Sequence, residues 1–296
     1  MGISGADLYI IAAGNGSRLN ANVPKALVPV VGEPCLTTTL RRIGLKFRRV
    51  FVATNVLVHD YWNNYFDGLR ASYPELTKLV INLPIRSGLG DGHATLQVIL
   101  AAESMMGTSL SQDIVVAWGD VFFPTHKLID ELLILSPEGS GLIPAVHESA
   151  PYVSLLVDER MRCISADFSK HGEHHAAGFH DQSVFRFNLS RLKEALCCLH
   201  RCLWKGERYL APAGELSLLY SLHQMYNSGD AAYVYQTGFP TLTFNTAKEI
   251  AAIRSNMGRR WSTEIEKPSQ VGAETLLARV PGLDHRSKIL EIDNLE

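Results

Sequence analysis

The sequence predicts a single α/β domain with a mixed, mainly parallel sheet that is covered by helices on both faces. Over the first 135 residues, short apolar segments typical of buried strands alternate with helical patterns. Such alternation indicates right-handed βαβ units, whose helices cover a parallel sheet on both sides. Beyond residue 135, strand-like segments follow one another with short loops, which predicts a mixed sheet. No repeat or low-complexity linker divides the 296 residues.

The individual elements follow from continuous apolar runs for strands and from the spacing of apolar side chains for helices. In the first half, strands are expected at 8–12, 50–54, 79–81 and 114–118, and helices at 37–45, 59–71, 91–106 and 125–135. In the second half, strands are expected at 141–146, 153–157, 182–187, 232–236 and 242–244, and helices at 189–203, 216–226 and 247–254. The side chains expected to face the core are Trp62, Tyr65 and Phe66 of one helix and Ala94, Val98, Ala101 and Met105 of another.

Composition limits the classes of function. Hydrophobic residues make up 46% and charged residues 20% of the chain, which predicts a packed globular protein. A net charge of -2 gives no reason to expect a nucleic-acid partner. No apolar run is long enough for a membrane span, and the N-terminus does not resemble a signal peptide. The odd number of five cysteines favours reduced thiols and therefore a cytoplasmic location.

The loop after the first expected strand has the chemistry of a phosphate-binding site. Glycines after a strand allow a sharp turn, and backbone N–H groups exposed in such a turn can bind an anion. Two cations follow: Arg18 has a forked donor set that suits phosphate, and Lys25 is preceded by Pro24, which stiffens the loop. The candidate nucleotide-binding residues of this loop are Ala12, Ala13, Gly14, Asn15, Gly16 and Ser17.

The loop does not match two other phosphate-binding motifs. The P-loop string Gly-x4-Gly-Lys-Ser/Thr does not occur. The dinucleotide fingerprint Gly-x-Gly-x-x-Gly fails because Leu19 stands at its third glycine. From the residues alone, a purely structural turn with solvated Arg18 and Lys25 is an equal alternative.

Three further segments carry polar groups at the ends of expected strands or helices. A glycine-rich loop precedes the helix at 91–106, and its Asp91 is able to cap that helix. Asp120 follows a buried strand, where a carboxylate is well placed for Mg²⁺ or, alternatively, for a turn. Asn245 offers an amide oxygen to Mg²⁺ or, alternatively, a cap to the helix at 247–254.

The segment at 11–34 resembles the start of the sugar-phosphate nucleotidyltransferase family. The resemblance rests on the order and spacing of three segments, 11–19, 24–30 and 32–34, which match a strand, Ala-Ala-Gly-x-Gly-x-Arg, Pro-Lys-x-Leu and Gly-x-Pro. It implies a three-layer α/β/α Rossmann-like fold of the nucleotide-diphospho-sugar transferase type. It also implies transfer of an NMP from an NTP to a phosphorylated acceptor, with Mg²⁺ as cofactor and release of pyrophosphate.

The same resemblance implies roles for the residues at matching positions. Arg18 would bind the β- and γ-phosphates, and Lys25 the α-phosphate and the incoming phosphate, so these two form the catalytic pair. Asp120 and Asn245 would hold Mg²⁺. The loop at 12–17 would frame the base and ribose together with a second group of residues, Gly88, Gly90, Asp91 and Gly92.

The acceptor side matches the family less well. Glu215 stands in a segment that resembles Gly-Glu-x-x-Leu-Thr-Asp without its Thr-Asp, and Gly178 resembles an acceptor-side glycine. The Glu-Lys-Pro segment expected before Gly178 is absent, and Lys170 stands nearest to its lysine. A sugar 1-phosphate is the family's usual acceptor. A small phosphate or phosphonate such as phosphocholine, used with CTP, is the alternative, and a catalytically silent nucleotide sensor is a third possibility.

These inferences define the expected organisation. Residues 1–255 would form the nucleotidyltransferase domain, with a nucleotide-binding half at 1–135 and an acceptor-binding half at 136–255. Residues 256–296 would form a helical tail that packs on the domain or at a homo-oligomer contact. The histidine-rich stretch at 171–180 is interpreted as a solvated or acceptor-facing loop, and Cys198 and Cys202 as buried thiols in preference to a zinc site.

Overall fold

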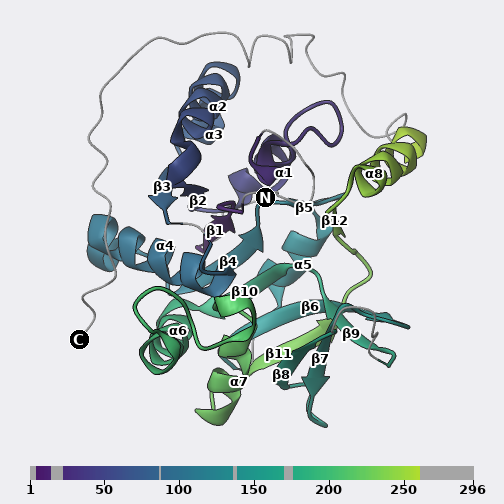
Figure 1. Ribbon diagram of the computed structural model, residues 1–296. Helices are drawn as coiled ribbons and strands as arrows, with labels where there is room; N and C mark the ends of the chain where they lie inside the picture. The colour runs from purple at the N-terminus through teal and green to yellow at the C-terminus, as the bar shows by residue number, and fades with distance from the viewer. Residues whose placement is uncertain (1–4, 15–22, 87, 136–138, 170–175, 261–296) are drawn as a thin grey trace.

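The computed structural model describes residues 5–14, 23–86, 88–135, 139–169 and 176–260. Within these residues, the central feature is a ten-stranded sheet with helices on both faces (Figure 1). Its strands lie in the order β3-β2-β1-β4-β10-β6-β9-β7-β8, and β11 pairs with β6 beside this path. The predicted mixed α/β fold is confirmed.

The first half forms the parallel part of the sheet. Its strands are β1 (Asp7–Ile11), β2 (Arg49–Asn55), β3 (Val80–Ile85) and β4 (Asp113–Trp118). The α-helices between and after them are α1 (Cys35–Ile43), α2 (His59–Ser72), α3 (Pro74–Thr77), α4 (Asp91–Met106) and α5 (Lys127–Ile134). Short 3-10 turns lie at η2 (Lys25–Leu27), η3 (Gly44–Lys46), η4 (Val56–Val58) and η5 (Gly107–Ser109).

The second half extends the sheet in mixed directions. Its strands are β6 (Gly141–Glu148), β7 (Val153–Val157), β8 (Cys163–Phe168), β9 (Gly178–Asp181), β10 (Val184–Asn188) and β11 (Ala232–Gln236). Strand β10 runs antiparallel to β4 and β6, whereas β11 runs parallel to β6. The helical elements are α6 (Leu189–Leu203), η6 (Pro212–Gly214), α7 (Tyr220–Asn227) and α8 (Ala247–Arg260). A separate two-stranded sheet joins β5 (Val121–Phe122) to β12 (Leu242–Thr243).

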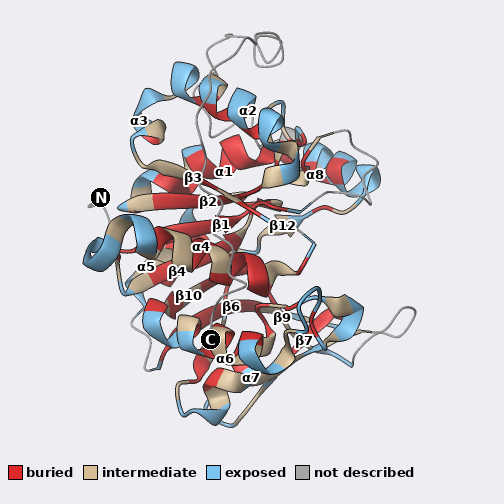
Figure 2. Ribbon diagram, turned by 60° about the vertical axis from the view of Figure 1, so that its left-hand side comes forward, coloured by how far each residue is buried: buried red, intermediate tan, exposed pale blue. Residues whose placement is uncertain are grey.

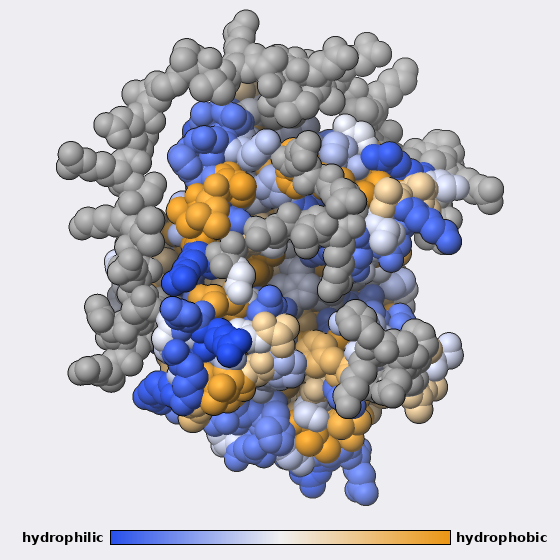
Figure 3. Space-filling view, viewed as in Figure 1, coloured by the Kyte–Doolittle hydropathy of each residue, from blue (hydrophilic) through white to orange (hydrophobic). Residues whose placement is uncertain are grey.

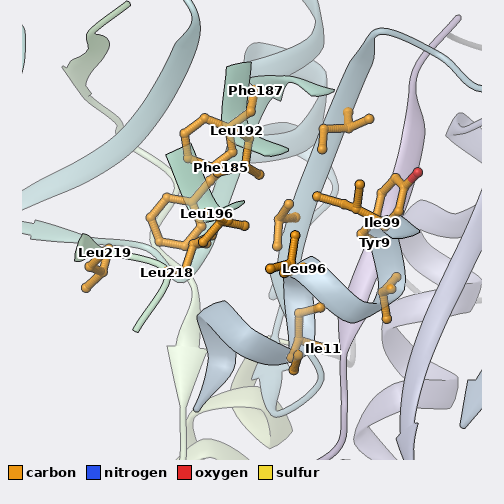
Figure 4. Close-up of a cluster of buried hydrophobic side chains, with 14 of the residues drawn as sticks. Tyr9, Ile11, Leu96, Ile99, Phe185, Phe187, Leu192, Leu196, Leu218 and Leu219 are labelled. Carbon is orange, nitrogen blue, oxygen red and sulfur yellow. The ribbon is translucent and has the colours of Figure 1, made fainter. Parts of the chain in front are cut away.

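The two faces of the sheet explain the three layers. Side chains alternate along a strand, so β1 sends Tyr9 and Ile11 to one face and Leu8 and Ile10 to the other. The first face packs under α4 and α6 (Figure 4) and under α7. The second face packs under α1, α2 and α5. In Figure 2 the buried residues follow the strands through the centre, while the outer sides of the helices are exposed.

The buried face of α4 and the start of α7 differ from the sequence-based expectation. On α4, Met105 is 57% exposed, whereas Ala102 is buried. The buried face of α4 is therefore shifted by about one residue from the predicted face. The shift arises because α4 packs against α6 as well as against the sheet. The helix expected at 216–226 begins only at Tyr220, because the backbone of Leu216 is already bonded to Leu89 and Gly92.

Candidate active site

Three predicted site residues meet at one point. The ammonium of Lys25, on η2, donates a hydrogen bond to the carboxylate of Asp120 and a second, 2.9 Å long, to the side-chain oxygen of Asn245. The side chains of Lys25 and Asp120 are 16% and 24% exposed, so the group faces solvent but is largely enclosed. The structure thus unites a cation, a carboxylate and an amide that lie far apart in the sequence.

The small two-stranded sheet places Asp120 beside Asn245. Strands β5 and β12 run antiparallel, and Thr243 pairs with Val121. Asp120 immediately precedes Val121, and Asn245 follows Thr243 by two residues, so both leave the sheet at the same end. The hydroxyl of Thr39 donates to the carbonyl of Val121 at 3.1 Å and anchors this end to α1.

Gly119 brings Asp120 close to the N-terminal loop. Its N–H donates to the carbonyl of Ile11 at 2.8 Å. A Cβ atom at Gly119 would lie 2.6 Å from the Cβ of Ala12, so only glycine permits this approach of β4 to the end of β1. Ala12 and Ala13 are buried, and Gly14 is exposed, so the described part of the loop reaches the surface beside Asp120.

A third, small core holds the Asn245 segment in place. It unites residues from η2 to α1, from β5 and from α8, and its buried members are Val28, Val30, Cys35, Phe122, Phe244, Ile250, Ile253 and Met257. Arg254 donates from its guanidinium to the carbonyls of Pro29 and Val30 at 2.7 and 2.8 Å. The ammonium of Lys25 lies 5.5 Å from the centre of the Phe244 ring. Helix α8 is therefore fastened to the segment that carries Lys25.

The expectation that Asn245 could cap α8 is wrong. The hydroxyl of Thr246 accepts from the N–H of Glu249 at 3.3 Å, so Thr246 is the capping residue. In return, the carboxylate of Glu249 accepts from the N–H groups of Asn245 and Thr246 at 2.5 and 2.8 Å. Partial burial acts to raise the pKa of Glu249, but these backbone donors lower it below its ordinary value. This capping box leaves the side-chain amide of Asn245 free of the helix and directed at Lys25.

The glycine-rich loop before α4 pairs with a distant segment of backbone. The N–H of Leu216 donates to the carbonyl of Leu89, and the N–H of Gly92 donates to the carbonyl of Leu216, each at 2.9 Å. Asp91 does not cap α4, contrary to expectation: Gly90 is at the cap position, and the Asp91 carboxylate accepts from the N–H of Leu218 at 2.6 Å. Burial raises the pKa of Asp91 to about 6.

This pairing accounts for two of the three glycines. A Cβ atom at Gly90 would lie 2.3 Å from the carbonyl oxygen of Leu216, and one at Gly92 would lie 2.7 Å from the carbonyl carbon of Ser217. Gly88 has a φ of +87° and meets nothing within 4 Å among the described residues. Close packing therefore explains why glycine is needed at the other two positions, but it gives no such reason for Gly88. Contact of this loop with a nucleotide stays a prediction.

The remaining predicted residues are dispersed. Glu215 is exposed and adjoins Leu216, so it lies next to the glycine-rich loop. Gly178 begins β9, where a Cβ atom would lie 2.7 Å from the hydroxyl oxygen of Ser154. None of the contacts in the described part of the chain joins Glu215 or Gly178 to Lys25. The predicted residues that lie outside the described residues are Asn15, Gly16, Ser17, Arg18 and Lys170.

A buried aromatic network beside this loop was missed in the sequence. The hydroxyl of Tyr209 lies 2.5 Å from Nδ1 of His93 and 2.7 Å from Nδ1 of His200. The ring of Trp204 stacks on both imidazoles, with centroids 5.9 Å and 5.5 Å away. The network ties the start of α4 to the end of α6 and to the segment before Leu216. Only the position of His93 beside the glycines hinted at it.

Burial of His93 predicts an acid-sensitive stability. Burial first, and then the charges of His200 and Arg86, lower the pKa of His93 from 6.5 to about 4. Between pH 6.5 and 4 the unfolded chain binds more protons at this residue, so stability falls as the pH is lowered through that window, by on the order of 3 kcal/mol. We expect His93→Gln, whose amide can still bond to Tyr209, to lose less stability on acidification. Urea unfolding of both proteins at about pH 7 and about pH 4.5 measures the difference. Equal losses would contradict the buried, neutral imidazole.

No group of three or more His, Cys, Asp or Glu side chains in the described ranges has the arrangement of a metal site. All five cysteines are free, but Cys202 is exposed and Cys198 half-buried, so the expectation of buried thiols is wrong for this pair. The i,i+4 spacing puts them on the outer side of α6.

Within the described part of the chain, no helix is both long and apolar enough to span a membrane. On the face in Figure 3, the coloured hydrophobic residues form separate groups among hydrophilic ones.

Comparison with known proteins identifies a family and a shared fold. The MobA-like NTP transferase domain family matches residues 8–221. Bifunctional protein GlmU of Ruegeria sp. (strain TM1040) is 30% identical over 127 residues, which make up 43% of this chain and 25% of that protein. Its counterpart from Dinoroseobacter shibae is 28% identical over 147 residues, or 49% of this chain and 30% of that protein. The chain therefore matches less than a third of the length of these relatives.

Solved structures share the fold at low sequence identity. A Bacillus anthracis protein described as a presumed glucose-1-phosphate thymidylyltransferase, in complex with sucrose, superposes with a TM-score of 0.64 at 14% identity. That match covers 90% of this chain and 98% of the other. HddC from Yersinia pseudotuberculosis, complexed with GMP-PN, has a TM-score of 0.59 at 17% identity and covers 85% and 99%. These similarities confirm the predicted three-layer architecture.

Proposed function

The chain belongs to the family of MobA-like NTP transferase domains, and we propose that it transfers the NMP of an NTP to a phosphorylated small-molecule acceptor. The convergence of Lys25, Asp120 and Asn245 carries this proposal. The three residues bring together a cation that would bind phosphate and two side-chain oxygens that would bind a divalent ion. An acceptor phosphate oxygen would attack the α-phosphorus, and the bond from that phosphorus to pyrophosphate would break.

The oxygen atoms present fit Mg²⁺. The Asp120 carboxylate and the Asn245 amide oxygen both face one cation, the ammonium of Lys25, which shows that these oxygens can converge on a positive charge. Mg²⁺ prefers oxygen ligands, and one or two protein ligands with phosphate and water complete its shell. Bound there, the ion would neutralise charge on the phosphates.

The chain's own residues would act mainly by positioning and charge. Lys25 presents three N–H donors on a flexible stem, in a segment stiffened by Pro24, and would bind the α-phosphate and the incoming phosphate. Arg18, which resembles the family's arginine, would bind the β- and γ-phosphates. Gly88 and the loop at 12–17 would frame the base and ribose. Phosphoryl transfer needs no covalent intermediate on the protein.

We propose that the acceptor is a sugar 1-phosphate. Lys170, Gly178 and Glu215, in the half at 136–255, would bind it. The absence of the Glu-Lys-Pro segment favours a second candidate, a cytidylyltransferase for a small phosphate or phosphonate. The free cysteines fit the cytoplasmic location that we also propose.

A pyrophosphate-release screen tests the function. Each of the common NTPs is incubated with Mg²⁺ and a panel of sugar 1-phosphates, phosphocholine and phosphonates, and each substrate alone serves as the control. We expect release with one NTP and one class of acceptor, and the class that supports release decides between the two candidates. Binding of an NTP without release from any pair would contradict the proposal and favour a nucleotide sensor.

A further inference from the structure

The ammonium of Lys25 lies against the two oxygens that we propose as Mg²⁺ ligands. We propose that Lys25 occupies the cation position in the nucleotide-free protein and keeps the site closed to divalent ions until a nucleotide phosphate draws it away. This inference rests on the proposed function for the identity of the metal ligands. It adds an order of events: the divalent ion enters with the nucleotide and not before it.

One position cannot serve both cations. The Lys25 ammonium is 2.9 Å from the side-chain oxygen of Asn245 and is in closer contact with Asp120. Mg²⁺ binds its oxygen ligands at about 2.0–2.1 Å, so an ion held by the same oxygens would lie within about 5 Å of the ammonium. Like charges at such a distance repel strongly in a partly enclosed site, where the Lys25 side chain is only 16% exposed.

Lysine is the partner that is able to move. Gly119 and Thr39 hold the backbone on both sides of Asp120 through hydrogen bonds of 2.8 and 3.1 Å. The capping box with Glu249 holds the backbone of Asn245. Lys25, by contrast, ends a stem of four carbons with many rotamers, and within the described residues its ammonium contacts only Asp120, Asn245 and the ring of Phe244.

A triphosphate supplies the alternative partner. The negatively charged phosphate oxygens would replace the hydrogen-bond partners that Lys25 gives up. The triphosphate would also add oxygen ligands for the divalent ion. Because coupling between two ligands is reciprocal, the nucleotide must raise the affinity for the ion by the same factor as the ion raises the affinity for the nucleotide. Removal of the Lys25 ammonium should weaken this coupling and open the site without nucleotide.

Mn²⁺ titration followed by electron paramagnetic resonance tests the inference, with full-length protein and no nucleotide. We expect Lys25→Met to bind Mn²⁺ at least about tenfold more tightly than the wild type, and Lys25→Gln to behave in the same way. The added affinity should disappear in Lys25→Met/Asp120→Asn. Lys193→Met is the matched control, because it removes one positive charge from an ion pair with Glu103, 2.6 Å long, outside the site, and should leave Mn²⁺ affinity unchanged.

The outcomes separate this inference from the proposed function. If folded Lys25→Met and Lys25→Gln both bind Mn²⁺ no more tightly than the wild type, the inference is wrong, even if the wild type releases pyrophosphate. A gain in the variants from a wild type that releases no pyrophosphate would support the closed site and contradict the transferase proposal.

Discussion

Replacement of Asp120 by alanine is expected to lower kcat/KM for pyrophosphate release by about 1,000-fold or more, which corresponds to about 4 kcal/mol of transition-state stabilisation. Asp120 contributes the only carboxylate that contacts Lys25 among the described residues. Its loss would remove the charged oxygen ligand for Mg²⁺ and leave the neutral amide of Asn245. Steady-state kinetics with the NTP and acceptor found in the screen provide the measurement.

The fold should survive this change. Asp120 lies at the end of a strand and remains partly exposed, so its removal leaves the sheet and its cores intact. Thermal unfolding checks this point. Asp158→Ala is the matched control, since Asp158 pairs with Arg162 in a turn between β7 and β8 and should leave turnover within a few-fold of the wild type. Comparable turnover in Asp120→Ala would refute the metal assignment.

Gly90→Ala is expected to be the most destabilising of the small substitutions, with a loss of about 3–5 kcal/mol in the free energy of unfolding. Gly90 has a φ of +95°, which an alanine adopts only with strain. Its Cβ would lie 2.3 Å from the backbone oxygen of Leu216, which cannot turn aside as a side chain would. The loop would therefore separate from its partner segment. Urea unfolding measures the loss.

The variant Gly88→Ala separates the effect of backbone strain from the effect of the steric clash. Gly88 has a similar φ of +87°, but a Cβ there meets nothing within 4 Å among the described residues. We therefore expect only the backbone strain, about 1–2 kcal/mol. Equal losses in the two variants would show that the pairing with Leu216 contributes nothing. If the loop frames the nucleotide as proposed, Gly88→Ala should cause a larger loss in the free energy of NTP binding than in the free energy of unfolding.

The strength of the local pattern explains which parts of the fold could be predicted from the sequence. Helices α4 (Asp91–Met106) and α6 (Leu189–Leu203) have the predicted bounds, because long periodic segments carry a strong signal. Strands β8 and β9 were missed, because most of their residues are only half-buried and show no apolar run. The two-residue strand β5 was missed as well, because it is too short to leave a pattern, whereas β12 lies within the strand expected at 242–244.

The candidate site shows a similar division. A family motif identified Lys25, Asp120 and Asn245, but their contact depends on chain separations of 95 and 220 residues, which no local pattern encodes. The bond between His93 and Tyr209 spans 116 residues and was not predicted at all. The cap of α8 was assigned one residue too early, although the spacing of Thr246 and Glu249 is that of a capping box and could have identified Thr246 from the sequence.

The late position of Asn245 in the chain has a consequence for biosynthesis. Every strand of the ten-stranded sheet ends by Gln236, so a nascent chain can complete this sheet before β12 and α8 leave the ribosome. Until then, Lys25 and Asp120 lack their amide partner, and Phe122 lacks the cover of Phe244. The nascent protein would thus form its sheet first and complete its candidate active site afterwards, when α8 docks.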